Sequence, residues 1–193
     1  MPWPSEHKRH SRERILCSAI ELFSQKGFDK VSIGEVMNNA QLTHGAFYAH
    51  FDSKQALYAE AIGAAARQSA LARMLPEDLA ETPDLKRLLA GYLSIAHVAQ
   101  EEPPCPLAFL ATDVANREGE VRSAYTRVFR RLLALIGRQL PGNSGTRKDK
   151  ALALAAMMVG GVAVARALDD EPTSHALLRA CREIGEQLIE DSP

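Results

Sequence analysis

A short segment in the first third of the chain carries polar side chains around two very small residues, Gly45 and Ala46. Small side chains let another molecule approach the backbone closely, and the flanking hydroxyl, imidazole and phenol groups can hydrogen-bond to base edges and phosphates. The chemistry this pattern suits is recognition of a nucleic acid. The candidate contacts are Thr43, His44, Gly45, Ala46, Tyr48 and His50, with Lys54 at the start of the next helix, where free amides also bind anions.

Two short helices joined by a three-residue turn must position these side chains. Ser32 and Glu35 form a capping box, which predicts a first helix ending near Asn39. After the connection 40–42, Thr43 can cap a second helix that ends near residue 51, anchored to the core by Phe47 and its neighbour four residues on. This arrangement is a helix-turn-helix, whose second helix can lie in the major groove of DNA.

Helical spacing of apolar residues continues along nearly the whole chain, which predicts an all-α fold. We expect a three-helix helix-turn-helix DNA-binding domain over residues 1–54 and a second helical domain over 55–193, to which the family resemblance described below assigns effector binding and dimerisation. Breaks are expected at Gly27, 101–106 and 141–145. The nine or so predicted helices span 11–26, 32–39, 43–51, 53–72, 82–100, 107–116, 120–140, 148–168 and 173–190.

Composition and cysteine spacing exclude several classes of protein. The 193 residues are 46% apolar and 24% charged, which is ordinary for a globular protein. Three widely separated cysteines predict neither a disulfide framework nor a zinc site, and no phosphate-binding loop is found, so we expect no metal and no cofactor. The apolar stretch 151–165 is shorter than the roughly 20 residues of a membrane span, and residues 1–10 contain no signal-peptide core. A cytoplasmic protein without a membrane partner is expected.

Many fixed spacings over roughly residues 9–60 agree at once with one family. The segment resembles the amino-terminal domain of TetR/AcrR regulators, and the residues that carry the resemblance are Arg14-Ile15-Leu16, Ala19, Leu22-Phe23, Lys26-Gly27-Phe28, Ser32-Ile33, Gly45-Ala46-Phe47-Tyr48-Ala49-His50-Phe51, Ser53-Lys54 and Leu57.

This resemblance implies roles for individual residues. His44, Gly45, Ala46 and Tyr48 match groove-facing positions of the recognition helix, and Tyr48, His50 and Lys54 match positions that contact phosphate. Ser32 matches a hydroxyl that touches the DNA backbone. His44 can equally be a solvated surface residue. Because the Gly45-Ala46 pair offers few polar groups, we expect recognition of the operator sequence to depend more on His44, Tyr48 and DNA shape.

Basic residues around the first helix are further candidates for phosphate or minor-groove contact. Arg12 and Arg14 lie in or next to that helix, whereas Lys8 is better interpreted as part of a tail.

The last two predicted helices have more apolar surface than a small monomer needs. The resemblance implies that they form a four-helix bundle across a dimer axis; an ordinary monomer core is the alternative. The seam residues are Leu177, Ala180, Cys181, Ile184 and Leu188, and Ala155, Ala156, Gly160, Gly161 and Ala163 permit close helix approach.

The resemblance also implies an effector pocket among the middle helices, for a small hydrophobic or electrophilic molecule. Its candidate residues, each of which can equally be core, are Tyr92, Ile95, His97, Phe109, Tyr125 and Phe129.

Cys105 lies in a proline-rich loop just before a predicted helix, whose amino terminus would favour the reactive thiolate. The segment around it is similar to a subgroup that includes electrophile sensors with a cysteine at this position. Glu101 and Glu102 nearby would oppose ionisation, so inert packing is the alternative.

These expectations define a ligand- or thiol-responsive regulator of transcription. It would be a repressor that binds a palindromic operator as a homodimer and is released by its effector. The alternatives are an enzyme and a helical adaptor without DNA binding. The acidic candidates for an enzyme, Asp113 with Glu118 and the run 169–171, are interpreted as helix-end or loop charges.

Overall fold

The computed structural model describes residues 5–69, 72, 84–99, 105–117 and 119–190, and over these residues it contains helices and no strand, as the sequence predicts. Eleven helical elements occur in the described part, against about nine predicted, because two predicted helices are broken. They are α1 Ser5–Lys26, α2 Ile33–Asn39, η1 His44–Ala49, α3 Lys54–Gln68, α5 Leu85–Tyr92, α6 Ile95–Val98, α7 Pro106–Phe109, α8 Ala111–Ala115, α9 Glu120–Gly137, α10 Ser144–Ala167 and α11 Glu171–Glu190.

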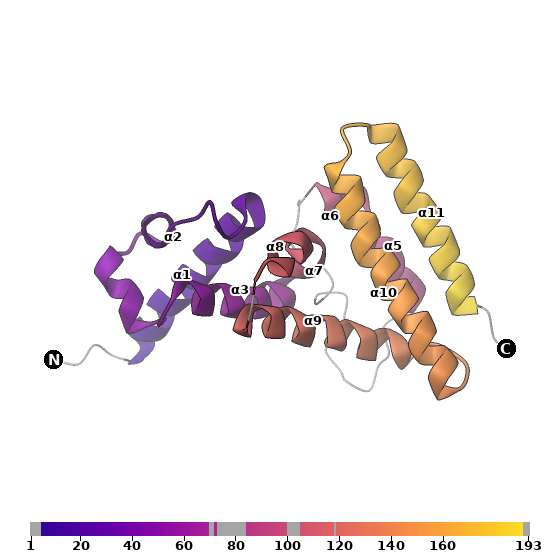
Figure 1. The fold of residues 1–193 in the computed structure, drawn as a ribbon, viewed down its shortest axis with the longest axis horizontal. Helices are drawn as coiled ribbons and strands as arrows, with labels where there is room; N and C mark the ends of the chain where they lie inside the picture. The colour runs from indigo at the N-terminus through magenta and orange to yellow at the C-terminus, as the bar shows by residue number, and fades with distance from the viewer. Residues whose placement is uncertain (1–4, 70–71, 73–83, 100–104, 118, 191–193) are drawn as a thin grey trace.

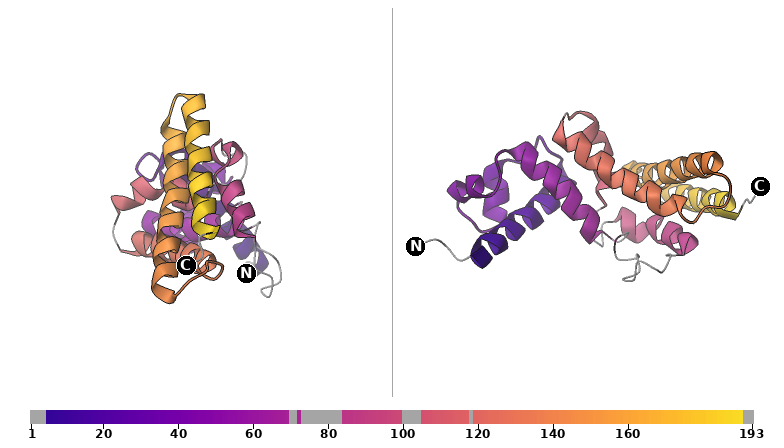
Figure 2. Two further views of the ribbon diagram at one scale, coloured as in Figure 1. Left: turned by 90° about the vertical axis from the view of Figure 1, so that its right-hand side faces the viewer. Right: turned by 90° about the horizontal axis from the view of Figure 1, so that it is seen from below.

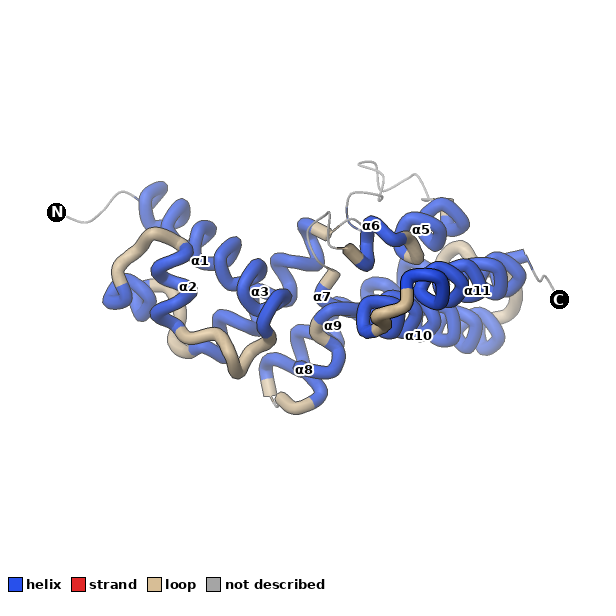
Figure 3. Tube along the Cα trace, turned by 90° about the horizontal axis from the view of Figure 1, so that it is seen from above, coloured by secondary structure: helices blue, strands red, loops and turns tan. Residues whose placement is uncertain are grey.

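The molecule is elongated, with its two ends made by different parts of the chain. Helices α1, α2 and η1 form one end, α10 and α11 form the other, and α3 and α9 run between them (Figure 1). The right view of Figure 2 and the view in Figure 3 show the same division. Helix α3 packs against both α1 and α9, so it connects the helix-turn-helix end with the middle of the molecule.

The helix-turn-helix is built on strong local signals. Helix α1 ends at Gly27, which has a φ of 76° and donates its amide to the Phe23 carbonyl at 2.9 Å. Ser32 caps α2 by accepting from the Glu35 amide at 3.1 Å, as the capping box predicts. The pKa of the Glu35 carboxyl is lowered, chiefly by its hydrogen bond with Lys26 and also by the Ser32 amide, which is the reciprocal half of the box.

Arg14 stabilises the turn between α2 and η1. Its guanidinium donates to the carbonyls of Ala40 at 2.5 Å and Gln41 at 3.4 Å. Gln41 has a φ of 54°, a left-handed conformation that is costly for a residue with a side chain. The sequence assigned Arg14 to phosphate contact, whereas the structure engages it in holding this turn.

The second helix of the motif is a 3-10 helix, not the α-helix that the sequence predicts. The Ala46 amide bonds to the Thr43 carbonyl at 3.0 Å and the His50 amide to the Phe47 carbonyl at 2.9 Å, both across three residues. Thr43 makes no side-chain capping bond. In so short a segment, hydrogen bonds between residues three apart cost little stability relative to those of an α-helix. Phe47 and Phe51 are still buried in the core.

Several predicted helix boundaries shift in the second half. Helix α3 ends at Gln68 rather than near residue 72, because Ser69 is extended and its hydroxyl donates to the Ala66 carbonyl at 2.9 Å. The predicted helix 82–100 is broken, because Ser94 caps the new helix α6 by accepting from the His97 amide at 3.2 Å. The predicted start at Thr82-Pro83 lies outside the described residues, and Asp84 is the cap of α5.

The predicted helix 107–116 is also divided, at Leu110, into α7 and α8. Helix α9 ends at Gly137, three residues earlier than predicted. Helix α10 begins at Ser144 rather than at residue 148, because Asn143 caps it by accepting from the Thr146 amide at 3.0 Å.

Helix α10 has the length and composition of a membrane span. In this fold it is a core helix, since Leu154, Met158 and Val162 are completely buried.

Arg14→Met should destabilise the protein by about 2 kcal/mol, because a charged donor to two turn carbonyls is lost. Arg9→Met is the matched control on the same helix, since the Arg9 side chain is 73% exposed and its pair with Glu13 spans 3.9 Å; it should cost less than about 0.5 kcal/mol. Urea unfolding followed by circular dichroism measures both. Equal effects of the two changes would mean that the turn does not depend on Arg14.

Candidate nucleic-acid interface

The outer surface of η1 is formed by the residues that the sequence selected. Thr43, His44 and Gly45 are exposed, Ala46 is half-buried, and Tyr48 is 63% exposed. Phe47, between them, is completely buried. The element therefore has one face fixed in the core and one face open to a partner.

Aromatic contacts hold the exposed rings in place. The Tyr48 ring meets Phe47 edge-on, with centroids 5.1 Å apart, and lies 6.4 Å from the His44 ring. A Cβ added at Gly34 would lie 3.8 Å from His44 Cδ2 and 3.9 Å from Ser32 Oγ. The predicted contacts at the start of α2 and on η1 thus form one continuous surface.

Gly45 is open on its outer side: a Cβ added there would have no heavy atom within 4 Å among the described residues. The position can accept a larger side chain without disturbing the free protein. Any requirement for glycine at this position therefore comes from a bound partner.

His50 lies at the edge of this surface. Its Nδ1 is buried and has no hydrogen-bond partner among the described residues. Burial lowers the pKa of His50, and the nearby Lys8 and Arg12 lower it further. An anion placed beside the ring would reverse this effect and favour the protonated form.

Two cationic side chains that the sequence predicts to contact DNA form contacts within the protein. Arg12 pairs with Glu60 of α3, and its guanidinium lies 4.7 Å from the Phe51 ring centroid. The Lys54 ammonium lies 4.0 Å from the Phe28 ring centroid, and burial lowers its pKa. Both side chains tie the helices of this end together.

The predicted effector-pocket residues are only partly brought together. Tyr92 and His97 are in ring contact at 4.5 Å, and His97 lies 5.7 Å from the Phe109 ring. Tyr125 donates to the Leu107 carbonyl at 2.7 Å. Phe129 packs against the core from the side, while Ile95 is 37% exposed. The rings of Tyr92, His97 and Phe109 thus pack against one another.

Cys105 lies next to this group and is 2% exposed. Its sulfur is 3.3 Å from the Tyr92 hydroxyl. Burial raises the pKa of the Cys105 thiol, although hydrogen bonds from Tyr92 and from the Leu107 and Ala108 amides act in the opposite direction. The amino terminus of a helix therefore lies beside Cys105, as predicted, but burial raises the pKa of the thiol by more than the helix amides lower it. Glu101 and Glu102 lie outside the described residues.

Asp113 joins helix α8 to the end of the molecule that holds the helix-turn-helix, a role that sequence reasoning missed. Its carboxylate accepts from the Phe28 amide at 3.2 Å and from the Tyr58 hydroxyl at 2.6 Å. Arg117, one turn on, pairs with Asp113 at 3.5 Å and with Asp29 at 2.5 Å. Asp113 lies in the first turn of α8, as its interpretation as a helix-end charge predicts, but the contacts with Phe28 and Tyr58 were not predicted. Glu118 lies outside the described residues. No local signal marks a partner 85 residues away.

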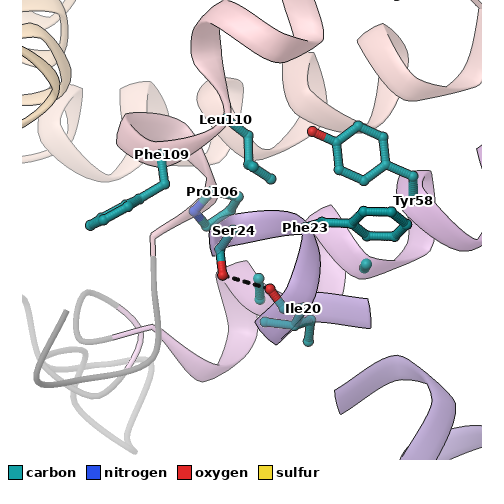
Figure 4. A pocket seen from close by; sticks show the side chains of 9 residues that line it. Ile20, Phe23, Ser24, Tyr58, Pro106, Phe109 and Leu110 are labelled. Carbon is teal, nitrogen blue, oxygen red and sulfur yellow. Dashed lines mark hydrogen bonds between the residues drawn. The ribbon is translucent and has the colours of Figure 1, made fainter. Parts of the chain in front are cut away.

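Apolar packing accompanies this polar contact. Figure 4 shows Pro106, Phe109 and Leu110 beside α1 residues in a narrow cleft, with the Ser24 hydroxyl donating to the Ile20 carbonyl. Arg166 of α10 lies 4.3 Å from the Phe109 ring centroid and donates to the Ser24 carbonyl at 3.5 Å. Helix α7, which begins directly after Cys105, thus packs against α10 and shares a cleft with the end of α1.

An all-helical body joined to an exposed, core-anchored helix-turn-helix defines a DNA-binding protein of the helix-turn-helix class. Residues 15–61 match the sequence profile described as bacterial regulatory proteins, tetR family. The chain is 49% identical over 45 residues to the HTH-type transcriptional regulator YvdT of Bacillus subtilis, which covers 23% of each protein. The amino-terminal segment of the chain is thus similar to the DNA-binding segment of TetR-family regulators.

A second curated relative and a solved structure extend this comparison. The HTH-type transcriptional regulator AcrR of Shigella flexneri is 40% identical over 55 residues, covering 28% of this chain and 26% of AcrR. The chain thus spans about a quarter of the length of these relatives. Reduced NemR of E. coli has the same fold, with a TM-score of 0.73, 21% identity, and coverage of 95% of this chain and 98% of NemR.

Iodoacetamide at about pH 7.5 should modify exposed Cys17 at least about 100-fold faster than Cys105, because the buried thiol is both shielded and protonated. The Cys105 rate should keep rising with pH above the usual thiol titration range. Peptide mass spectrometry measures each site, and in guanidinium chloride the rates should become similar. Comparable rates in the folded protein would contradict the burial of Cys105.

Proposed function

We propose that the protein is a one-component transcriptional regulator, a repressor that binds a palindromic operator as a homodimer. The single observation that carries this proposal is the η1 surface, with Phe47 buried and Tyr48, His44 and Gly45 presented outward. A core-anchored helix with a nearly bare outer face suits insertion into a major groove. Such a protein acts in the cytoplasm, where its DNA lies.

An enzyme and an adaptor are weaker alternatives. The curated relatives in the comparison are transcription regulators, in line with the interpretation from sequence. Asp113, which was a candidate for catalysis, is occupied by the Phe28 amide and the Tyr58 hydroxyl. An adaptor gives no reason for the open face of η1.

A dimer through α10 and α11 is supported by the apolar surface that these helices leave exposed. Val164 is 51% and Ile184 50% exposed, on neighbouring helices that pack along each other. A Cβ at Gly160 would meet no described atom within 4 Å, so a partner helix can approach there. Each recognition helix reads only a few base pairs, and two-fold pairing supplies the remaining affinity.

Two of the small residues assigned to this interface belong instead to the interior. Ala155 is completely buried, and a Cβ at Gly161 would lie 3.0 Å from Leu93 Cδ2 and 3.2 Å from Cys181 Sγ. The proposed interface therefore contains Ala156, Gly160 and Ala163.

The effector is proposed to be a small hydrophobic molecule that separates the rings of Tyr92, His97 and Phe109. Entry there would move α7, whose Phe109 and Pro106 line a cleft together with Ile20, Phe23 and Ser24 of α1 (Figure 4). Because the buried Cys105 thiol has a raised pKa, ligand binding is a better-supported trigger than thiol modification. A two-state shift of this kind changes the operator affinity through the spacing of the recognition helices.

Selection from a random duplex library should yield a palindromic operator, and Gly45→Glu should weaken its binding by about 100-fold, because a carboxylate would replace open space beside the phosphates. The melting temperature should not change. Ser123→Glu, which places the same charge on the exposed surface of α9, is the control. Fluorescence anisotropy at several salt concentrations measures affinity, with a steep salt dependence expected. Failure to enrich any sequence would refute the proposed function.

Gly160→Arg should convert the dimer into a monomer that keeps its helical content, because the position is open in the single chain and arginine favours helix over glycine. Sedimentation equilibrium measures the mass. Ser123→Arg is the matched control and should remain dimeric. A dimeric Gly160→Arg protein would place the interface elsewhere.

A further inference from the structure

A groove of about 430 Å³ lies between α9 and the first part of α10, near the turn that joins them. In Figure 1 these helices meet at the lower right, away from the helix-turn-helix. They touch where a Cβ on Gly137 would lie 4.0 Å from the Ala151 Cβ, and the groove is beside this contact. Its volume is within the range of small-molecule sites.

The groove combines an apolar floor with positive charge. Leu133 and Leu152 contribute apolar surface, and Leu152 is 38% exposed although it is a large hydrophobic side chain. Arg130, Arg147 and Lys148 supply three cations, and none of the nine described lining residues is acidic. By contrast, the groove between α3 and α9 has Glu60 and Glu120 beside its arginines. The lining residues of the second groove thus partly balance its positive charge, whereas those of the first do not.

Arg147 is held in a fixed position and has unused donor capacity. One terminal nitrogen donates to the Gly142 carbonyl at 3.0 Å. Its Nε is buried and has no hydrogen-bond partner among the described residues. Because Nε has almost no exposed surface, an acceptor in the groove would bond to the terminal nitrogens of the guanidinium and not to Nε. The first turn of the long helix α10, at Ser144, also lines the groove and contributes its positive end.

The groove is separate from the proposed dimer interface. Ser144, Arg147, Lys148 and Ala151 are spaced three and four residues apart, so they share one face of α10, the face that is buried at Ala151. The residues proposed to meet the second copy, Ala156, Gly160 and Ala163, lie mostly on a different side of the helix, and Leu152, four residues before Ala156, marks the border between groove and interface. Dimerisation would leave the charged side of the groove open.

We propose that this groove binds an amphipathic organic anion, with a short apolar chain on the leucine floor and a carboxylate or similar group between Arg130, Arg147 and Lys148. The apolar floor favours such a ligand over an inorganic anion, and the three cations favour it over a neutral hydrophobe. The site does not involve η1, so it stands independently of DNA binding.

Isothermal titration of the full-length protein with octanoate, 1-octanol and inorganic phosphate tests the site. Octanoate should bind saturably with one site per chain, and the other two at least about tenfold more weakly. The double variant Arg130→Gln, Lys148→Gln should bind octanoate about tenfold more weakly without a change for octanol. The double variant Arg122→Gln, Arg127→Gln removes the same charge from α9 outside the groove, and its octanoate affinity should stay within about twofold of wild type.

Leu152→Gln, at an exposed lining position, should weaken octanoate and octanol alike. Equal affinity for octanol and octanoate, equal losses in the two double variants, or no saturable octanoate binding would each overturn the proposal. The operator affinity of every variant is measured in parallel, so that a failed groove is distinguished from a failed regulator.

Discussion

The carboxylate of Asp113 makes the contact on which the coupling of helix α8 to the helix-turn-helix end of this molecule depends. It accepts from the amide of Phe28, which follows α1, and from the hydroxyl of Tyr58 in α3, so one side chain of α8 holds two parts of the DNA-binding end. Tyr58 is completely buried, and burial together with Asp113 raises its pKa far above the physiological range, so it remains a donor. Arg117 keeps the surrounding charge balanced by pairing with Asp29 and Asp113.

Packing around this contact connects the proposed effector site with the proposed DNA-binding surface. Helix α7 lies beside α8, follows Cys105 in the chain, and carries Phe109, which is in contact with both the His97 ring and Arg166. Arg166 in turn reaches the end of α1 through the Ser24 carbonyl. If a bound small molecule displaced α7, the position of α1 would therefore change as well, because close-packed interiors transmit shifts instead of absorbing them.

Local signals in the sequence predicted most of the fold. Caps at Ser32 and Ser53 and the glycine after α1 are decided by residues within a few positions, and all three occur as expected. The same holds for the exposed face of η1, because the spacing of Phe47 and Phe51 fixes which side is buried. Contacts over long sequence distances could not be predicted, and Asp113 with Phe28 is the clearest case. Nor did spacing distinguish a 3-10 helix at η1 from an α-helix, since so short a segment fits both periods.

The open space around Gly45 has a consequence for the history of such a protein. Side chains on the outer face of η1 take little part in the core, so exchanging them carries almost no folding penalty. Sequence preference for DNA can then diverge one substitution at a time between gene copies, while Arg14 and the buried phenylalanines keep the scaffold unchanged. Paralogues that arise in this way would differ in their targets well before they differ in thermal stability.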